Sequence, residues 1–200
     1  KWFDQTFMKK RFNVLVTRRL HSEALDKLEK KCNIILHSGK IPMPKKILMS
    51  KIKNADGLVC HPYDIVDKDV ISNGKNLKAI STFSVGFDHI DLDAAKERGI
   101  VVSHTPDIVT NDTADIALSL MINVLRRIVE ADAYVRVGNW ERKGDIGLGH
   151  SLTDKKVGIV GLGRIGKAIA RRAEAVDCKV SYYGRSKKDD VSYEFVPDLS

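Results

Sequence analysis

The stretch Val157-Gly-Ile-Val-Gly-Leu-Gly-Arg-Ile-Gly166 decides the fold of this chain. It opens with a short apolar run rich in β-branched residues, which predicts a buried strand because the run is too short for a helix. Gly161, Gly163 and Gly166 then have the spacing G-x-G-x-x-G. Apolar residues recur at helical spacing from there to Val176, so the sequence predicts a strand, a tight turn and a helix in succession.

Each glycine of this pattern has its own physical role. The first permits a tight turn, the second lets the backbone approach a pyrophosphate, and the third lets helix and strand pack closely. A second predicted strand at 179–183 completes a βαβ unit, which favours a dinucleotide site over a glycine turn without a ligand. The residues expected to hold the dinucleotide at this turn are Gly161, Leu162, Gly163, Arg164, Ile165 and Gly166.

Composition narrows the class of protein. The 200 residues are 43% apolar, enough for a sizeable core in one domain or two small ones. The net charge of +8 is spread over scattered lysines without a dense basic block, so we expect no nucleic-acid partner. Three widely spaced cysteines indicate reduced thiols, no metal site and a cytoplasmic location. The sequence has no apolar run of membrane-spanning length and no signal-peptide pattern.

Residues 1–105 alternate predicted strands and helices joined by short loops. Because that alternation is typical of a parallel sheet covered on both faces, we expect an α/β domain here. Ser22 is the expected N-cap of the first helix. Strands are expected at 12–17, 32–36, 56–60, 77–83 and 100–103, and helices at 23–31, 44–53, 68–72 and 92–98.

The second domain is predicted to span 106–200, because Pro106 favours a crossing point between domains. Asp112 or Thr113 is expected to cap one long helix over 112–137, whose apolar residues cover more than one face. Such a helix predicts burial between domains or against a second subunit. Only 17 residues follow the second strand of the βαβ unit, and about six strands make a full dinucleotide fold, so this domain is expected to be truncated.

Several segments of the chain resemble the D-isomer-specific 2-hydroxyacid dehydrogenases, and among them the glyoxylate/hydroxypyruvate reductase branch. The resemblance implies a flavodoxin-like α/β lobe that holds substrate, and the first half of a Rossmann lobe that holds a nicotinamide cofactor. The matching segments are Ser84-Val85-Gly86-Phe87-Asp88-His89-Ile90-Asp91-Leu92, Thr105-Pro106-Asp107, Thr113-Ala114-Asp115, Arg126-Arg127, Gly138-Asn139-Trp140 and 157–172.

The resemblance also implies that the backbone amides of Val85 and Gly86 bind the substrate carboxylate. A carboxylate needs fixed donors, and a glycine lets it come close. The alternative is that Gly86 only shapes a turn after its strand. Cys60 and His61, at the end of the preceding strand, are expected to line the same cleft.

Cofactor choice depends on the residues after the strand at 179–183. The strand leads into Gly184, and Arg185, Ser186 and Lys187 follow it, where an NAD-preferring protein usually has an acidic residue. We expect these residues to attract the 2′-phosphate of NADP. The alternative is a solvated basic loop in which Asp189 or Asp190 folds back to serve NAD. Thr113 is a further expected cofactor contact.

The expected reaction is reduction of a small 2-oxo acid, such as glyoxylate or hydroxypyruvate, to glycolate or D-glycerate with NADPH. The resemblance implies a catalytic arginine, carboxylate and histidine, and no residue of this chain matches their motifs. The catalytic groups are therefore expected beyond Ser200, and the chain alone is expected to be inactive. None of the six histidines is predicted to donate the proton, and His21, His37 and His150 are expected to be solvated.

Alternatives remain open. One is a reductase of a bulkier acid such as hydroxyphenylpyruvate. Another is a regulatory protein that senses the nucleotide without turnover, because one fold can host different functions. A homodimer is expected in the complete protein, formed through the helix at 112–137. Poor solubility is expected for the chain alone, because the strand at 179–183 would be left as an unpaired edge.

Overall fold

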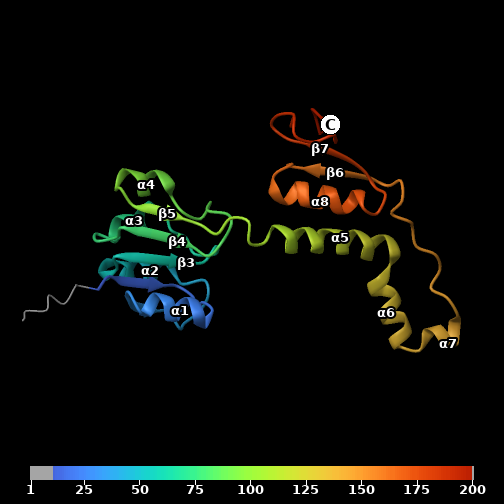
Figure 1. The fold of residues 1–200 in the computed structure, drawn as a ribbon. Helices are drawn as coiled ribbons and strands as arrows, with labels where there is room; N and C mark the ends of the chain where they lie inside the picture. The colour runs from blue at the N-terminus through green and yellow to red at the C-terminus, as the bar shows by residue number, and fades with distance from the viewer. Residues whose placement is uncertain (1–10, 200) are drawn as a thin grey trace, which may run out of the picture. The chain divides into compact units, whose positions relative to one another are not determined.

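The computed structural model describes residues 11–199, which form two compact units that divide between Pro106 and Asp107 (Figure 1). Each unit holds a parallel sheet with helices packed against it, so the predicted α/β class is confirmed. Within the described residues, no helix has the length and apolarity needed to cross a membrane.

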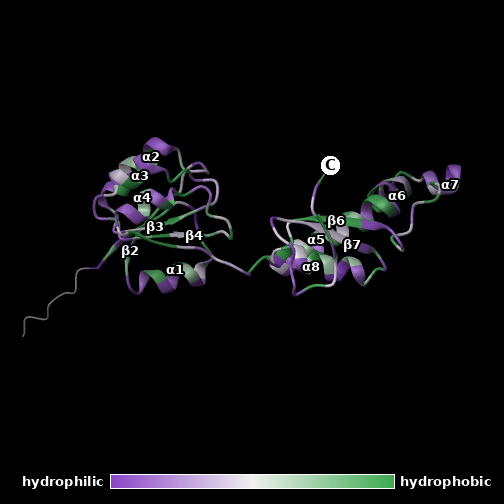
Figure 2. Ribbon diagram, turned by 90° about the horizontal axis from the view of Figure 1, so that it is seen from above, coloured by the Kyte–Doolittle hydropathy of each residue, from purple (hydrophilic) through white to green (hydrophobic). Residues whose placement is uncertain are grey.

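Unit 1 contains a five-stranded parallel sheet in the order β2-β1-β3-β4-β5. In Figure 2, α1 covers one face of the sheet and α2, α3 and α4 cover the other. The chain reverses its direction of travel across the sheet between β1 and β3, which is the topological switch point of this strand order. The elements are β1 Asn13–Val16, α1 Ser22–Glu29, β2 Asn33–Leu36, α2 Lys45–Lys51, a 3₁₀ turn Ile52–Asn54, β3 Gly57–Cys60, α3 Lys68–Asn73, β4 Ala79–Thr82, α4 Leu92–Glu97 and β5 Val101–Ser103.

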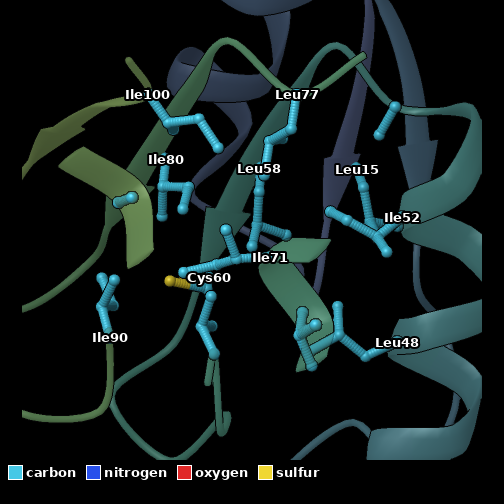
Figure 3. Close-up of a cluster of buried hydrophobic side chains, with 14 of the residues drawn as sticks. Leu15, Leu48, Ile52, Leu58, Cys60, Ile71, Leu77, Ile80, Ile90 and Ile100 are labelled. Atoms are coloured by element: carbon cyan, nitrogen blue, oxygen red, sulfur yellow. The ribbon is translucent and has the colours of Figure 1, made fainter. Parts of the chain in front are cut away.

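The core of unit 1 follows from strand register. Leu15 pairs with Leu58, and Leu58 pairs with Ile80, so these side chains form one row on the same face of the sheet. The row packs against Leu48 of α2 and Ile71 of α3, and all five side chains are at most 1% exposed (Figure 3). Full burial of each such side chain contributes roughly 1.5–3 kcal/mol to the stability of the fold. Because another register would expose these side chains, their burial fixes the register and, with it, the positions of the strand ends.

Unit 2 contains a three-stranded parallel sheet in the order β6-β7-β8. Helix α8 covers one face, where Ala170 packs with Ile159 and Tyr182. Helix α5 packs against α8 (Figure 1), and Arg172 Nε of α8 lies 2.6 Å from Asp115 Oδ1 of α5. The elements are α5 Thr110–Arg126, α6 Ile128–Arg136, α7 Asn139–Lys143, β6 Lys156–Val160, α8 Arg164–Glu174, β7 Lys179–Tyr183 and β8 Glu194–Val196.

The prediction of one helix over 112–137 is wrong. The helix breaks at Arg127, whose backbone is left-handed with φ of +55°. The Arg127 guanidinium donates to the carbonyl of Ile146 at 3.0 Å and to Glu130, and these bonds hold the break in place. Apolar residues of both helices remain exposed within this chain, among them Leu120, Val124 and Val129.

Two predicted helix caps are also wrong. Ser22 is the first residue of α1, His21 holds the cap position, and no side chain caps this helix within the described residues. Helix α5 begins at Thr110, earlier than predicted, so neither Asp112 nor Thr113 caps it. A short helix that the sequence did not predict, α7, follows Gly138.

The free edge of the second sheet differs from the prediction. The sequence predicted an unpaired edge at residues 179–183, but Tyr182 of β7 pairs with Ile159 on one side and Phe195 on the other. Among the described residues, β6 and β8 are the two edge strands of this sheet, and Val160 of β6 is 71% exposed. Strand β8 was not predicted because Phe195 and Val196 are its only apolar residues, and a run of two does not indicate a strand.

Candidate functional site

The glycine turn of unit 2 joins β6 to α8. Gly161 has a φ of +94°, a conformation that favours glycine, and its N–H donates to the carbonyl of Tyr183 at 2.8 Å. Leu162 is 3% exposed and anchors the turn in the core. A Cβ on Gly166 would collide with the carbonyl oxygen of Gly161, so helix and strand approach as closely as the third glycine predicts. A Cβ on Gly163 would meet no atom within 4 Å, which leaves open space above the turn.

The N-terminus of α8 faces that open space without a cap. No side chain of the described residues caps it, and its first turn carries no acidic residue. Its unpaired backbone N–H groups therefore suit an anion. Arg164 is the first helical residue, and its Nε lies 2.8 Å from Asp107 Oδ1. Ile165 is half-buried beside it.

The end of β7 lies beside this turn. Val160 pairs with Tyr183, so Gly161 and Gly184 leave the sheet at adjacent positions. The side chains of Arg185, Ser186 and Lys187 follow and are exposed. The register thus brings the basic residues and the glycine turn to one edge of the sheet, as parallel pairing predicts.

The two aspartates beyond this basic segment are the open alternative for NAD, and one of them has a clear partner. Asp190 forms an ion pair with Lys167 of α8, which lowers the pKa of its carboxyl. Its carboxylate is therefore engaged on the surface of α8. Thr113 lies exposed in the first turn of α5, and within the described residues no hydrogen bond joins its side chain to the glycine turn.

The loop after β4 presents two free amides. Its carbonyls are occupied, because the Ser84 hydroxyl donates to Gly86 and His104 Nδ1 lies 2.9 Å from the carbonyl of Val85. No hydrogen bond within residues 11–199 occupies the N–H of Val85 or Gly86. A Cβ on Gly86 would meet nothing closer than 3.8 Å, so the fold itself does not require glycine there.

The buried carboxylate of Asp64 joins three loops at the carboxyl edge of unit 1. Asp64 is 1% exposed and accepts from the N–H of His61 at 2.8 Å, from the N–H of Met43 at 3.1 Å and from the Thr17 hydroxyl. These donors come from the ends of β1 and β3 and from the segment before α2. The carboxylate therefore fixes the loops at the switch point relative to one another.

His61 and Cys60 lie at the end of β3, as predicted. Arg18 Nη1 donates to His61 Nε2 at 2.6 Å, so the imidazole accepts in its neutral form. Burial and the neighbouring Arg18 charge lower the pKa of His61. Burial raises the pKa of the Cys60 thiol to about 12, which leaves it an unreactive wall residue. His89 Nε2 lies 2.9 Å from Thr82 Oγ1, and burial lowers the pKa of His89 as well.

Sequence reasoning missed Thr17, Arg18 and Asp64 at this edge. One signal existed, since Thr-Arg-Arg directly follows a buried strand, and residues there gather at the carboxyl edge of a parallel sheet. The prediction that His37 is solvated is wrong, because it is 7% exposed and its Nε2 lies 3.0 Å from the carbonyl of Lys40. No cluster of His, Cys, Asp and Glu suited to a metal occurs in the described part of the chain.

The two α/β units, and the loops at the carboxyl ends of their strands, define a two-lobed α/β protein with a glycine turn of the Rossmann kind. The chain belongs to the D-isomer specific 2-hydroxyacid dehydrogenase family, whose catalytic-domain model matches residues 14–192. It is 41% identical over 187 residues to a glyoxylate reductase of Thermococcus litoralis, covering 90% of this chain and 56% of that protein. It is 42% identical over 186 residues to a glyoxylate/hydroxypyruvate reductase A of Arabidopsis thaliana, covering 93% and 59%.

Solved structures agree with this membership. A crystal structure of the TT0316 protein from Thermus thermophilus has a TM-score of 0.85 at 43% identity, covering 92% of this chain and 59% of that one. An NADPH-dependent glyoxylate/hydroxypyruvate reductase from Sinorhizobium meliloti, in complex with NADP and malonate, has a TM-score of 0.80 at 29% identity, covering 94% and 58%. The chain thus spans less than two thirds of the length of these relatives.

We expect Gly→Ala substitutions at the second and third glycines of the turn to differ in their effect on the free energy of unfolding. Gly166→Ala should destabilise the protein by about 1–3 kcal/mol, because the new methyl group must push α8 away from Gly161. Gly163→Ala is the matched control and should change the free energy of unfolding little, since its Cβ meets open space. Urea unfolding monitored by circular dichroism measures both, and equal losses would contradict the close approach at Gly166.

Asp64→Asn should destabilise the protein by about 2–4 kcal/mol, because an amide N–H₂ would face donors that now share a carboxylate. Asp69→Asn is the matched control. Its carboxylate is 70% exposed and pairs with Lys45 on the surface, so the change should stay within about 0.5 kcal/mol. Equilibrium urea unfolding of both variants checks the prediction, and an Asp64→Asn protein as stable as the control would refute the role of the buried carboxylate.

Proposed function

We propose that the protein of which this chain is part reduces small 2-oxo acids, such as glyoxylate or hydroxypyruvate, with NADPH as the preferred cofactor. The observation that carries the proposal is the presence of unpaired donors at the carboxyl ends of the strands in both sheets. One offers free amides at Val85 and Gly86, and the other offers an uncapped helix N-terminus behind a glycine turn. The names of the relatives support the reaction, and their greater length makes it a proposal for the whole protein.

The glycine turn is the proposed pyrophosphate site. The open space above Gly163 admits a phosphate, and the α8 N-terminus supplies N–H donors and partial positive charge. Arg164, Ile165 and the glycines would hold the dinucleotide by their backbone, with Thr113 as a further contact. When bound, the nicotinamide cofactor supplies the hydride that reduces the keto group.

The amides of Val85 and Gly86 are the proposed carboxylate site. Two fixed N–H donors orient a 2-oxo acid, and the occupied carbonyls of the same loop keep those donors in place. Cys60 and His61 would form the neighbouring wall. Burial lowers the pKa of His61 and His89, so we assign proton donation to neither.

NADP is preferred in this proposal because of the charge at the end of β7. Arg185 offers a planar set of donors for a 2′-phosphate, with Ser186 and Lys187 beside it. A carboxylate that serves NAD would have to come from the segment beyond, where Asp190 is engaged with Lys167. Because Asp190 is paired with Lys167, its carboxylate is less available to the ribose hydroxyl of NAD, and this favours the 2′-phosphate of NADP at the end of β7.

A homodimer is also proposed for the complete protein. Helices α5 and α6 expose apolar side chains within this chain, including Val124 at 75% and Val129 at 70% exposed. A second copy would remove this apolar surface from water. Gel filtration or sedimentation of the complete protein would decide the oligomeric state.

Arg185→Ala should weaken NADPH binding about tenfold or more and NADH binding less than about twofold, because only NADPH loses a charge-assisted hydrogen bond. Fluorescence titration of each nucleotide measures both constants. Arg136→Ala is the matched control, since it removes the same charge from an exposed ion pair on α6. Equal losses for the two nucleotides would reject the NADP assignment. Tight NADPH binding by the complete protein without reduction of glyoxylate would favour a nucleotide-sensing protein instead.

A further inference from the structure

A small pocket lies at the switch point of the unit 1 sheet. It has a volume of about 120 Å³ and opens where β1 and β3 end. Its walls include Arg18, Arg19 and His21 after β1, His61 after β3, and Phe83 after β4. In open α/β sheets, ligands bind outside the carboxyl ends of the strands at this point. The volume suffices for a group of a few heavy atoms.

The chemistry of the pocket is cationic. Arg18 uses one N–H to bind neutral His61, and a guanidinium has five such donors. No ion pair within residues 11–199 engages Arg18 or Arg19. The nearest buried carboxylate, Asp64, already accepts three hydrogen bonds from other groups. The Arg18 guanidinium is thus oriented by His61 but has no anionic partner in the described part of the chain.

The backbone around this cation is fixed in advance. Asp64 binds the hydroxyl of Thr17, the residue before Arg18, and also binds the N–H of His61. One buried carboxylate therefore holds His61 and the residue that precedes Arg18. Preorganised donors of this kind bind an anion with less loss of conformational entropy.

The pocket also lies on the same edge as the Val85–Gly86 amides. Strand β4 is separated from β1 by β3 alone, which places the two loops roughly 10 Å apart at a strand spacing of about 4.8 Å. With hydrogen bonds of about 2.9 Å at each end, a chain of four or five carbons with a carboxylate at both ends spans this separation.

We propose that Arg18, oriented by His61, forms a subsite for the second carboxylate of a 2-oxo dicarboxylic acid. The inference rests on the proposed function, because the first carboxylate occupies the amides of Val85 and Gly86. Arg18 is then a specificity-determining residue. It extends the substrate class from glyoxylate to longer 2-oxo acids with an acidic far end, and it leaves glyoxylate binding unchanged.

The test is an NMR titration of the isotope-labelled chain with 2-oxoglutarate. The matched probe is 2-oxopentanoate, which has the same number of carbons but no second carboxylate. We expect 2-oxoglutarate to bind at least about fivefold more tightly and to shift the Arg18 Nε–H and His61 ring signals. Arg18→Gln should abolish the preference and leave the binding of 2-oxopentanoate unchanged. Arg136→Gln, which removes an exposed charge from α6, should preserve the preference.

The outcomes separate this inference from the proposed function. Equal affinity for the two probes, or a preference that survives in a folded Arg18→Gln protein, overturns the subsite. If neither probe binds, the subsite is also overturned, while the nucleotide titration of Arg185→Ala still judges the cofactor half of the proposed function. If 2-oxoglutarate binds through Arg18 without shifting the Val85 and Gly86 amides, the proposed carboxylate site is wrong, and Arg18 binds an anion but is not a subsite for a second carboxylate.

Discussion

Parallel strand pairing is the constraint on which both candidate sites depend. In a parallel sheet all carboxyl ends reach one edge, so loops distant in sequence meet there. In unit 1 this brings Arg18, His61 and the Val85–Gly86 loop to one edge. In unit 2 the pairing of Val160 with Tyr183 sets the glycine turn beside Arg185. Each site is thus a consequence of register, and the buried rows of the core hold the register.

Two local contacts convert this arrangement into sites with fixed geometry. Asp64 satisfies three donors from three segments with one buried carboxylate, which ties the ends of β1 and β3 together. Gly166 lets α8 press against Gly161, which leaves the uncapped helix N-terminus at the turn. The first contact is electrostatic and the second is steric. At both places hydrogen-bond donors remain without an anionic partner among the described residues, a condition that suits anionic ligands.

The sequence allowed prediction of the elements with strong local signals. Short apolar runs located β1, β3 and β6, and the spacing of Gly161, Gly163 and Gly166 located the turn. Long-range contacts were beyond prediction, because nothing near Asp64 in the sequence identifies Thr17 or Met43 as its donors. The break at Arg127 was missed for the same reason, since the carbonyl that stabilises it belongs to Ile146. Sequence motifs identified candidate site residues, but the contacts between those residues could be seen only in the structure.

The central claim is that the turn at the carboxyl edge of β6 holds the pyrophosphate of a dinucleotide. A crystal structure of this chain with NADPH tests it most directly. We expect pyrophosphate oxygens within about 3 Å of the backbone N–H groups at Gly163 and Arg164, with the 2′-phosphate beside Arg185. A nucleotide bound elsewhere, or a pyrophosphate out of reach of the α8 N-terminus, would contradict it.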